Sequence, residues 1–88
     1  MVAEREQIRL AQHLGQLVYE RRVALDLSQA GLGERLAMTA DEVETVELGG
    51  MLPVTADLLV RLAAALRVEV DLRVMTDGSN TLAFEDAA

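Results

Sequence analysis

The sequence contains no cysteine, no tryptophan and no lysine, and its aromatic residues are Tyr19 and Phe84. Without cysteine, the chain can form no disulfide, no thiolate zinc site and no cysteine nucleophile. With so few aromatic rings, a core has to be built from leucine, valine, alanine and isoleucine. His13 is the single histidine, which leaves few ways to combine an acid, a base and a nucleophile in one pocket. We therefore expect no enzyme, and no cofactor or metal ion.

Long hydrophobic runs are also missing. The longest apolar run, residues 62–66, is far too short to cross a bilayer. Residues 1–9 are rich in charge, and the hydrophobic segment of a signal peptide does not follow them. We therefore expect a cytoplasmic protein without membrane association.

Positive charge is scarce as well. The 8 basic residues stand against 15 acidic ones, which gives a formal net charge of −7. Because the neutralisation of phosphates supplies most non-specific affinity for nucleic acids, this balance argues against indiscriminate binding to DNA or RNA.

Helical periodicity is the main pattern that the sequence does contain. The chain has 88 residues, of which 51% are hydrophobic, so it is long enough for the core of one small domain. Apolar residues recur at spacings of three and four, which is typical of amphipathic helices. This spacing predicts four helices, over residues 4–25, 29–37, 40–48 and 55–67.

From Val68 the spacing of apolar residues changes to two, which predicts a half-buried strand over residues 68–75. Turn-forming residues come next, and residues 81–84 are predicted to return as a short second strand. The main folded unit is therefore expected over residues 1–75, and residues 76–88 supply a turn, the short strand and a frayed tail.

Helix ends are marked by capping residues. Ser28 is a good N-cap for the second helix, and Thr39 with Glu42 forms a capping box at the start of the third. We also expect Gly33 to let another helix approach closely. Gly15 is expected only to weaken its helix slightly, and His13 is expected to be a solvated surface residue.

Three segments together carry a resemblance to a known family. They are the opening Leu27-Ser28-Gln29, the exit Val46-Glu47-Leu48-Gly49 and the fourth-helix run Leu62-Ala63-Ala64-Ala65-Leu66. With them, residues 14–74 resemble the Cro/C1-type (Xre) helix-turn-helix family, and the strand 69–74 is similar to that of some antitoxin-like members. The resemblance implies a mostly α, four- to five-helix, lambda-repressor-like domain with a C-terminal β-strand or short hairpin. It also implies a DNA-binding transcriptional regulator that acts as a dimer on a palindromic operator.

The resemblance also assigns roles to single residues. It implies that helix 40–48 enters the major groove, that Gln29 touches a phosphate and braces this helix, and that Thr39 contacts the DNA backbone. Arg21 and Arg35 are the candidate phosphate contacts. At about 100° per residue, Glu44 shares a helix face with the implied base-contacting positions, which are Ala40, Asp41, Thr45 and Leu48.

Glu47 is expected on the inward side of the same helix. Many members of the family pair a glutamate at this position with an arginine of the first helix, and Arg22 occupies that place here. We therefore predict a partly buried Arg22–Glu47 ion pair that ties the first helix to the third. The alternative is two solvated surface charges.

The third helix departs from the family in its charge. It carries acidic residues and no basic one, although base-reading helices favour donors such as arginine, lysine and asparagine. Apolar Leu48, Met51 and Leu52 beside Asp41 and Glu44 would suit a protein partner instead. The alternative function is thus a degenerate interaction module (an antitoxin, antirepressor or co-regulator) that binds DNA weakly or not at all. Against this, Met51 and Leu52 could pack under the fourth helix, and the carboxylates could simply cap the third.

The strand 68–75 cannot stay unpaired, because a lone half-apolar strand is not stable in water. It has to pair with residues 81–84, with a second subunit or with a partner protein. We expect a homodimer with two-fold symmetry, built on this strand or on the apolar stripe of the first helix.

Overall fold

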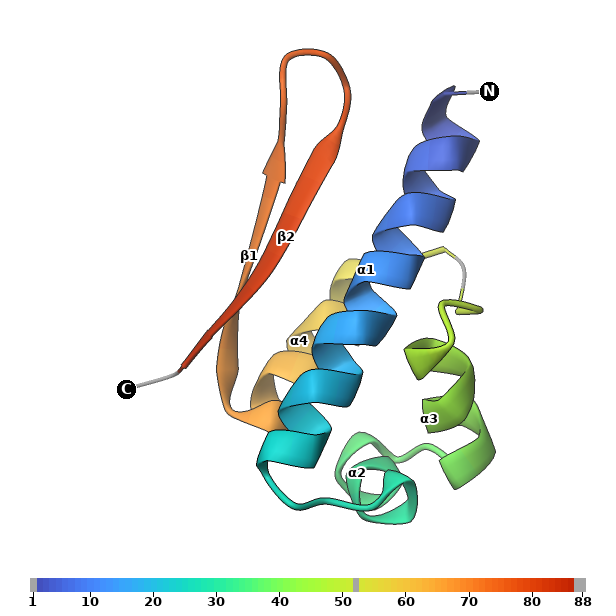
Figure 1. Cartoon of the computed structure of the whole chain (residues 1–88), viewed down its shortest axis with the longest axis vertical. Helices are drawn as coiled ribbons and strands as arrows, with labels where there is room; N and C mark the ends of the chain where they lie inside the picture. Colours follow the sequence, from blue (N-terminus) through green and yellow to red (C-terminus); the bar gives the residue numbers. More distant parts are fainter. Residues whose placement is uncertain (1, 52, 87–88) are drawn as a thin grey trace.

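The computed structural model describes residues 2–51 and 53–86. It is mostly helical, with four helices followed by a two-stranded antiparallel hairpin, as the periodicity predicts (Figure 1). None of the described helices is long and apolar enough to span a membrane. The helices are α1 (Val2–Ala24), α2 (Gln29–Leu36), α3 (Ala40–Glu47) and α4 (Ala56–Leu66).

The helices begin where their capping residues predict. The Ser28 hydroxyl accepts the Gly31 N–H at 2.9 Å, which satisfies one of the free donors in the first turn of α2. At α3, Thr39 accepts the Glu42 N–H while the Glu42 carboxylate accepts the Thr39 N–H, so both halves of the capping box form. These bonds fix the first turns of α2 and α3.

The core lies between α1, the α2–α3 pair and α4, and it is aliphatic as expected. Tyr19 is about half exposed, and Phe84 only packs against the edge of the core. The core therefore depends on the close packing of branched aliphatic side chains. Its most deeply buried members are Leu14, Val18, Leu32, Val43, Leu62 and Leu66.

The hairpin consists of β1 (Val68–Val74) and β2 (Asn80–Asp86), paired so that Leu72 faces Leu82. The second strand is longer than the predicted 81–84. The reason is that it pairs with β1 along its whole length, from Val68 opposite Asp86 to Val74 opposite Asn80, so its bounds follow from the partner strand. Its outer edge docks against α1 at Asn80 and Leu82, a long-range contact that local spacing cannot show. Figure 1 places the hairpin on the side of the molecule opposite α3.

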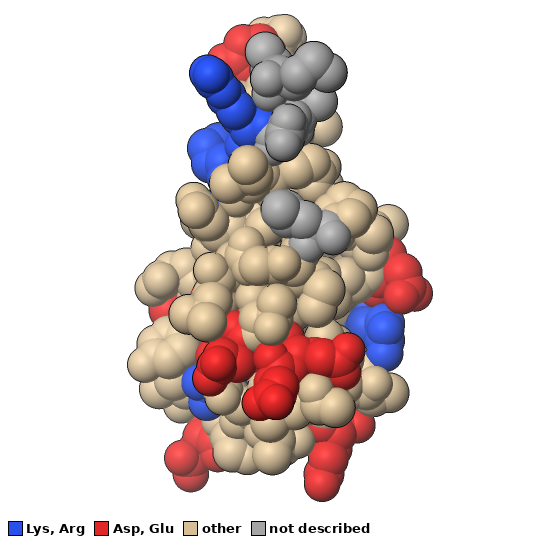
Figure 2. Space-filling model, turned by 90° about the vertical axis from the view of Figure 1, so that its right-hand side faces the viewer, with Lys and Arg blue, Asp and Glu red and all other residues tan. Residues whose placement is uncertain are grey.

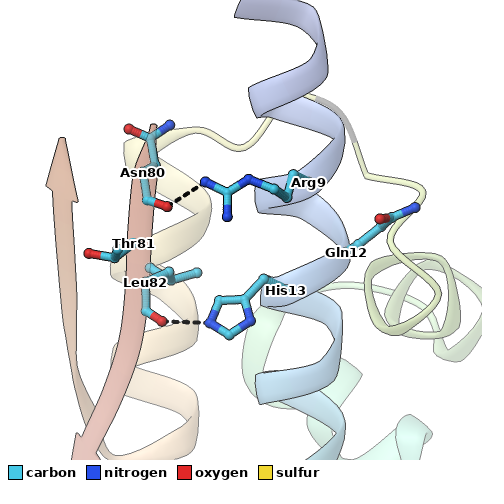
Figure 3. A pocket seen from close by; sticks show the side chains of 6 residues that line it. All are labelled: Arg9, Gln12, His13, Asn80, Thr81 and Leu82. Carbon is cyan, nitrogen blue, oxygen red and sulfur yellow. Dashed lines mark hydrogen bonds between the residues drawn. The ribbon is translucent and has the colours of Figure 1, made fainter. Parts of the chain in front are cut away.

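His13 contributes to this docking, which corrects its expected role as a purely solvated residue. Its Nε2 donates a hydrogen bond to the Leu82 carbonyl oxygen at 2.7 Å, and Arg9 donates to the Asn80 carbonyl oxygen at 2.8 Å (Figure 3). Sequence periodicity placed His13 correctly on an exposed helix face but could not show that a strand from the other end of the chain lies there.

Candidate binding surface on helix α3

A partly buried polar cluster joins α1, α2 and α3. Arg22 Nε lies 2.6 Å from Glu47 Oε2 and Arg22 Nη2 lies 3.0 Å from Glu47 Oε1, so the pair is bidentate. Gln29 donates to Glu47 Oε1 at 3.2 Å, and Arg22 Nη1 donates to the Leu27 carbonyl oxygen at 2.9 Å. The predicted Arg22–Glu47 pair is confirmed, and the two-solvated-charges alternative is wrong.

Burial makes this cluster more than a surface ion pair. The Glu47 side chain is 5% exposed and the Arg22 side chain 13%. The hydrogen bond to Glu47 raises the pKa of Arg22 above its ordinary value, against the opposing effect of burial. The Arg22 guanidinium also lies 5.4 Å from the centre of the Tyr19 ring. The cluster therefore fixes how α3 is set against α1.

Two glycines allow close backbone contacts. Gly15 lets α3 approach α1, and Gly33 lets the turn before α3 approach α2. A Cβ at Gly15 would lie 2.5 Å from the Val46 carbonyl oxygen, and one at Gly33 would lie 2.5 Å from the Met38 carbonyl oxygen. The close approach expected at Gly33 therefore involves the turn before α3 and not another helix. Gly15 does more than weaken its helix, because the backbone of α3 rests against it.

The outward face of α3 is acidic and partly apolar. Asp41, Glu44, Thr45 and Leu48 are exposed, with Leu48 at 77%, whereas Ala40 is half-buried. The Thr45 hydroxyl donates to the Asp41 carbonyl oxygen at 3.0 Å, within the helix. Figure 2, which views this side of the molecule, shows acidic side chains grouped near the middle of the face. We call the outward side chains of Asp41, Glu44, Thr45 and Leu48 the α3 face.

Two other residues that the resemblance assigned to DNA already have partners inside the domain. The Gln29 amide binds Glu47, as its bracing role requires. The Thr39 hydroxyl accepts the Glu42 N–H in the capping box. Gln29 is the first residue of α2 and Thr39 is the N-cap of α3, and both bonds hold α3 in place.

The structure does not bring Arg21 and Arg35 to the α3 face. Arg35 donates to the Ala65 carbonyl oxygen at 3.0 Å, and Arg21 donates to the Leu66 carbonyl oxygen at 3.1 Å. Arg21 also lies 2.8 Å from the Asp86 carboxylate. Both guanidiniums therefore bind the carbonyl groups at the C-terminal end of α4, where positive charge is favourable. A sequence alone carries no signal for such contacts between distant helices.

The apolar residues after α3 divide between the two interpretations. Met51 is partly buried against the core, which agrees with the interpretation that it packs inside the domain and does not line a partner surface. Leu52 lies outside the described residues. Leu48 is thus the apolar residue that the structure places on the α3 face.

No group of three or more histidine, aspartate or glutamate side chains that could hold a metal ion occurs within residues 2–51 and 53–86. Comparison of the chain with protein-family models, with curated proteins and with solved structures found no match. The function therefore has to be argued from the α3 face and its supports.

Proposed function

We propose that this protein is a helix-turn-helix transcriptional regulator of the Cro/C1 type, in which α3 is the recognition helix and duplex DNA is the ligand. The observation that carries the proposal is the Arg22–Glu47–Gln29 cluster, because it uses the residues that the family resemblance singles out. The cluster holds the inward side of α3 and leaves the α3 face exposed. A helix that is fixed on one side and exposed on the other is suited to enter a major groove.

Within this proposal, the chemistry of the α3 face limits what it reads. Asp41 can accept a hydrogen bond from the amino group of cytosine, and Thr45 can donate or accept at a base edge. Phosphate contacts are few, since Arg21 and Arg35 are engaged with α4. Two copies would present two α3 helices to a roughly palindromic operator.

A protein ligand is the second candidate, and one observation favours it. In the described part of α3 no basic side chain is present, while Asp41, Glu42 and Glu44 are exposed. A carboxylate-rich surface is repelled by the negative groove of DNA and attracted to a basic surface. Under this second proposal, Leu48 supplies the apolar centre of the contact and the carboxylates supply the charged rim.

Selection of duplexes from a random pool, followed by fluorescence anisotropy at about 50 mM salt, tests the first proposal in the regime where DNA affinity is highest. We expect Thr45→Ala to weaken binding to the selected duplex by about 1–3 kcal/mol, with relaxed preference at one base pair. Thr81→Ala, on the exposed face of the hairpin, is the matched control and should leave affinity unchanged. Absence of any selected duplex would contradict DNA binding by the isolated protein.

The same assay addresses the second candidate through charge reversal. If the carboxylates repel DNA, the double variant Asp41→Arg, Glu44→Arg gains affinity for duplexes that the wild-type protein does not bind. Glu20→Arg with Glu85→Arg changes the net charge equally, away from α3, and should gain much less. A stoichiometric protein partner that is lost on Leu48→Asp would support the second candidate, whereas a clear footprint on DNA without a partner would contradict it.

A further inference from the structure

The two edges of the hairpin differ in how they are covered. On the outer edge of β2, the Asn80 N–H donates to the Glu6 carboxylate at 3.0 Å, and the Asn80 and Leu82 carbonyl oxygens accept bonds from Arg9 and His13. Figure 3 shows β2 lying between β1 and α1, with the side chains of Arg9 and His13 reaching across to it. Side chains of α1 thus occupy the edge positions at Asn80 and Leu82 that another strand would use.

The outer edge of β1 has no such cover. The hairpin is closed by the Met75 N–H bond to the Ser79 carbonyl oxygen, so alternate residues of β1 point their backbone groups toward β2 and away from it. Those of Val70, Leu72 and Val74 point away. Among the described residues, these outward N–H and C=O groups have no hydrogen-bond partner. An uncovered strand edge of this kind is a template for pairing with another strand.

Apolar side chains follow the same uncovered edge. Val74 is 73% exposed and Leu72 is 42% exposed, and Val60 on the neighbouring helix α4 is 68% exposed. A shallow, mainly apolar groove of about 270 Å³ runs between β1 and α4. It is lined by Ala56, Leu59, Val60, Ala63, Val70 and Leu72. A strand added to β1 would place its own apolar side chains over this groove.

We propose that the occupant of this edge is a second copy of the chain, with the two β1 strands antiparallel and the two-fold axis at Leu72. Leu72 then faces the partner's Leu72, and Val70 faces the partner's Val74. On the opposite, solvent-facing side, Asp71 faces the partner's Arg73, and Arg73 faces the partner's Asp71. The two hairpins form one continuous four-stranded sheet, whose apolar face continues across the axis.

Charge complementarity selects both this occupant and this register. Asp71 and Arg73 lie on the same face of β1, with Arg73 Nε 3.2 Å from Asp71 Oδ2, so their order along the strand is self-complementary under a two-fold axis at Leu72. An axis at Asp71 brings Glu69 opposite the partner's Arg73 but places the two Asp71 carboxylates directly opposite each other. An axis at Arg73 does the same with the two Arg73 side chains, and an axis at Val70 places Glu69 opposite Asp71. Like charges directly opposite each other destabilise a strand pair.

An axis at Val74 places Leu72 opposite Thr76 and Arg73 opposite Met75, which leaves Asp71 and Arg73 without an opposite charge between the strands. Among the axes within two residues of Leu72, the one at Leu72 is therefore the one that unites apolar with apolar and acid with base without placing like charges opposite each other. This pairing requires no DNA, and its test can fail while DNA binding stands.

Sedimentation velocity of the full chain and two charge variants tests the proposal. The wild-type protein should sediment as a dimer of 9.6 kDa chains. Asp71→Arg places two arginines opposite each other and Arg73→Asp places two aspartates, so each variant alone should dimerise about tenfold more weakly or worse. An equimolar mixture of the two variants should dimerise again, because each chain then faces its complement.

The mixture also serves as the folding control, since recovery requires that both variants are folded. Glu85→Arg on β2 changes the charge by the same amount as Asp71→Arg, away from the β1 edge, and should leave the dimer intact. A wild-type protein that stays monomeric at millimolar concentration would overturn the proposal. So would single variants that dimerise as the wild type does, or a mixture that stays monomeric.

Discussion

At the residue scale, the Arg22–Glu47 pair is the contact that most clearly links sequence to structure. Its two side chains come from α1 and α3, and both are largely removed from solvent. A buried pair adds an uncertain amount of net stability, because desolvation offsets the attraction between the charges. Its main effect here is to specify how α1 and α3 meet, since Glu47 also receives the amide of Gln29.

Removal of one partner should therefore be costly. Because Arg22→Leu leaves the Glu47 carboxylate buried without its cation, we expect the free energy of unfolding to fall by about 3–5 kcal/mol. The double variant Arg22→Leu, Glu47→Leu should lose less than the sum of the two single losses. Urea unfolding followed by circular dichroism measures the free energy of unfolding of the wild type, Arg22→Leu, Glu47→Leu and the double variant. Strictly additive losses would show that the pair is not coupled.

Glu6 gives the hairpin docking a dependence on pH. Its hydrogen bond from Arg9, joined by one from the Asn80 N–H, lowers the pKa of Glu6 against a smaller opposing effect of burial. A carboxyl group with a lowered pKa in the folded state stabilises the protein above its unfolded pKa, and this contribution is lost as the pH falls through the folded value.

We therefore expect Glu6→Gln to lower the melting temperature at pH 7, with a difference from the wild type that shrinks toward pH 3. Glu34→Gln, at an exposed position of α2, is the control and should show little difference at either pH. Melting curves by circular dichroism provide the measurement. A Glu6→Gln effect that is the same at both pH values would show that the charge of Glu6 does not hold β2.

At the element scale, the packing of α1 on α3 depends on the absence of a side chain. Gly15 is buried in the middle of α1, where an alanine would normally favour the helix by up to about 1 kcal/mol. The carbonyl oxygens of Val46 and Glu47 would lie only 2.5 and 2.6 Å from that alanine Cβ. They belong to the backbone of α3 and cannot move without shifting the helix that carries the α3 face.

Gly15→Ala should therefore destabilise the protein, by about 1–3 kcal/mol, because overpacking outweighs the gain in helix propensity. Gly31→Ala in α2 is the matched control, since its Cβ would meet no atom closer than the Ser28 hydroxyl oxygen at 3.2 Å. Because only the Ser28 side chain has to shift slightly, Gly31→Ala should cost much less stability than Gly15→Ala in the same unfolding experiment. A stabilised Gly15→Ala variant would contradict the close contact between α1 and α3.

At the scale of the whole molecule, the distribution of charge matters more than its total of −7. Arg21 and Arg35 bind carbonyl groups at the end of α4, and Arg61 of α4 binds the Leu36 carbonyl oxygen at the end of α2. The scarce cations thus hold helices together, and the carboxylates of the α3 face remain exposed.

This distribution predicts a shallow salt dependence for any DNA complex. With about one or two phosphates neutralised per chain, the logarithm of affinity should fall with the logarithm of salt concentration at a slope of roughly −1 to −2. Anisotropy titrations between about 50 and 200 mM salt measure this slope. A much steeper slope would mean that Arg21 and Arg35 leave α4 to contact phosphates.

Local patterns in the sequence determined the elements and their caps, and the family resemblance pointed to one long-range contact. The helices and β1 lie within one or two residues of their predicted bounds, because periodicity and capping are properties of neighbouring residues. The Arg22–Glu47 pair could be predicted because the family resemblance supplied its partner positions. The docking of β2 against α1 could not be predicted, since its bonds with Glu6, Arg9 and His13 join opposite ends of the chain.

The sequence by itself determined that the chain forms a small helical domain with a hairpin, because hydrophobic spacing sets both the type of each element and the face it buries. Only the tertiary structure decided that Arg21, Arg35 and Arg61 are engaged, since their partners are backbone carbonyl groups at the ends of distant helices. It also decided which strand edge is open: side chains of α1 bond the outer edge of β2 at Asn80 and Leu82, whereas the outer edge of β1 has no hydrogen-bonded strand among the described residues.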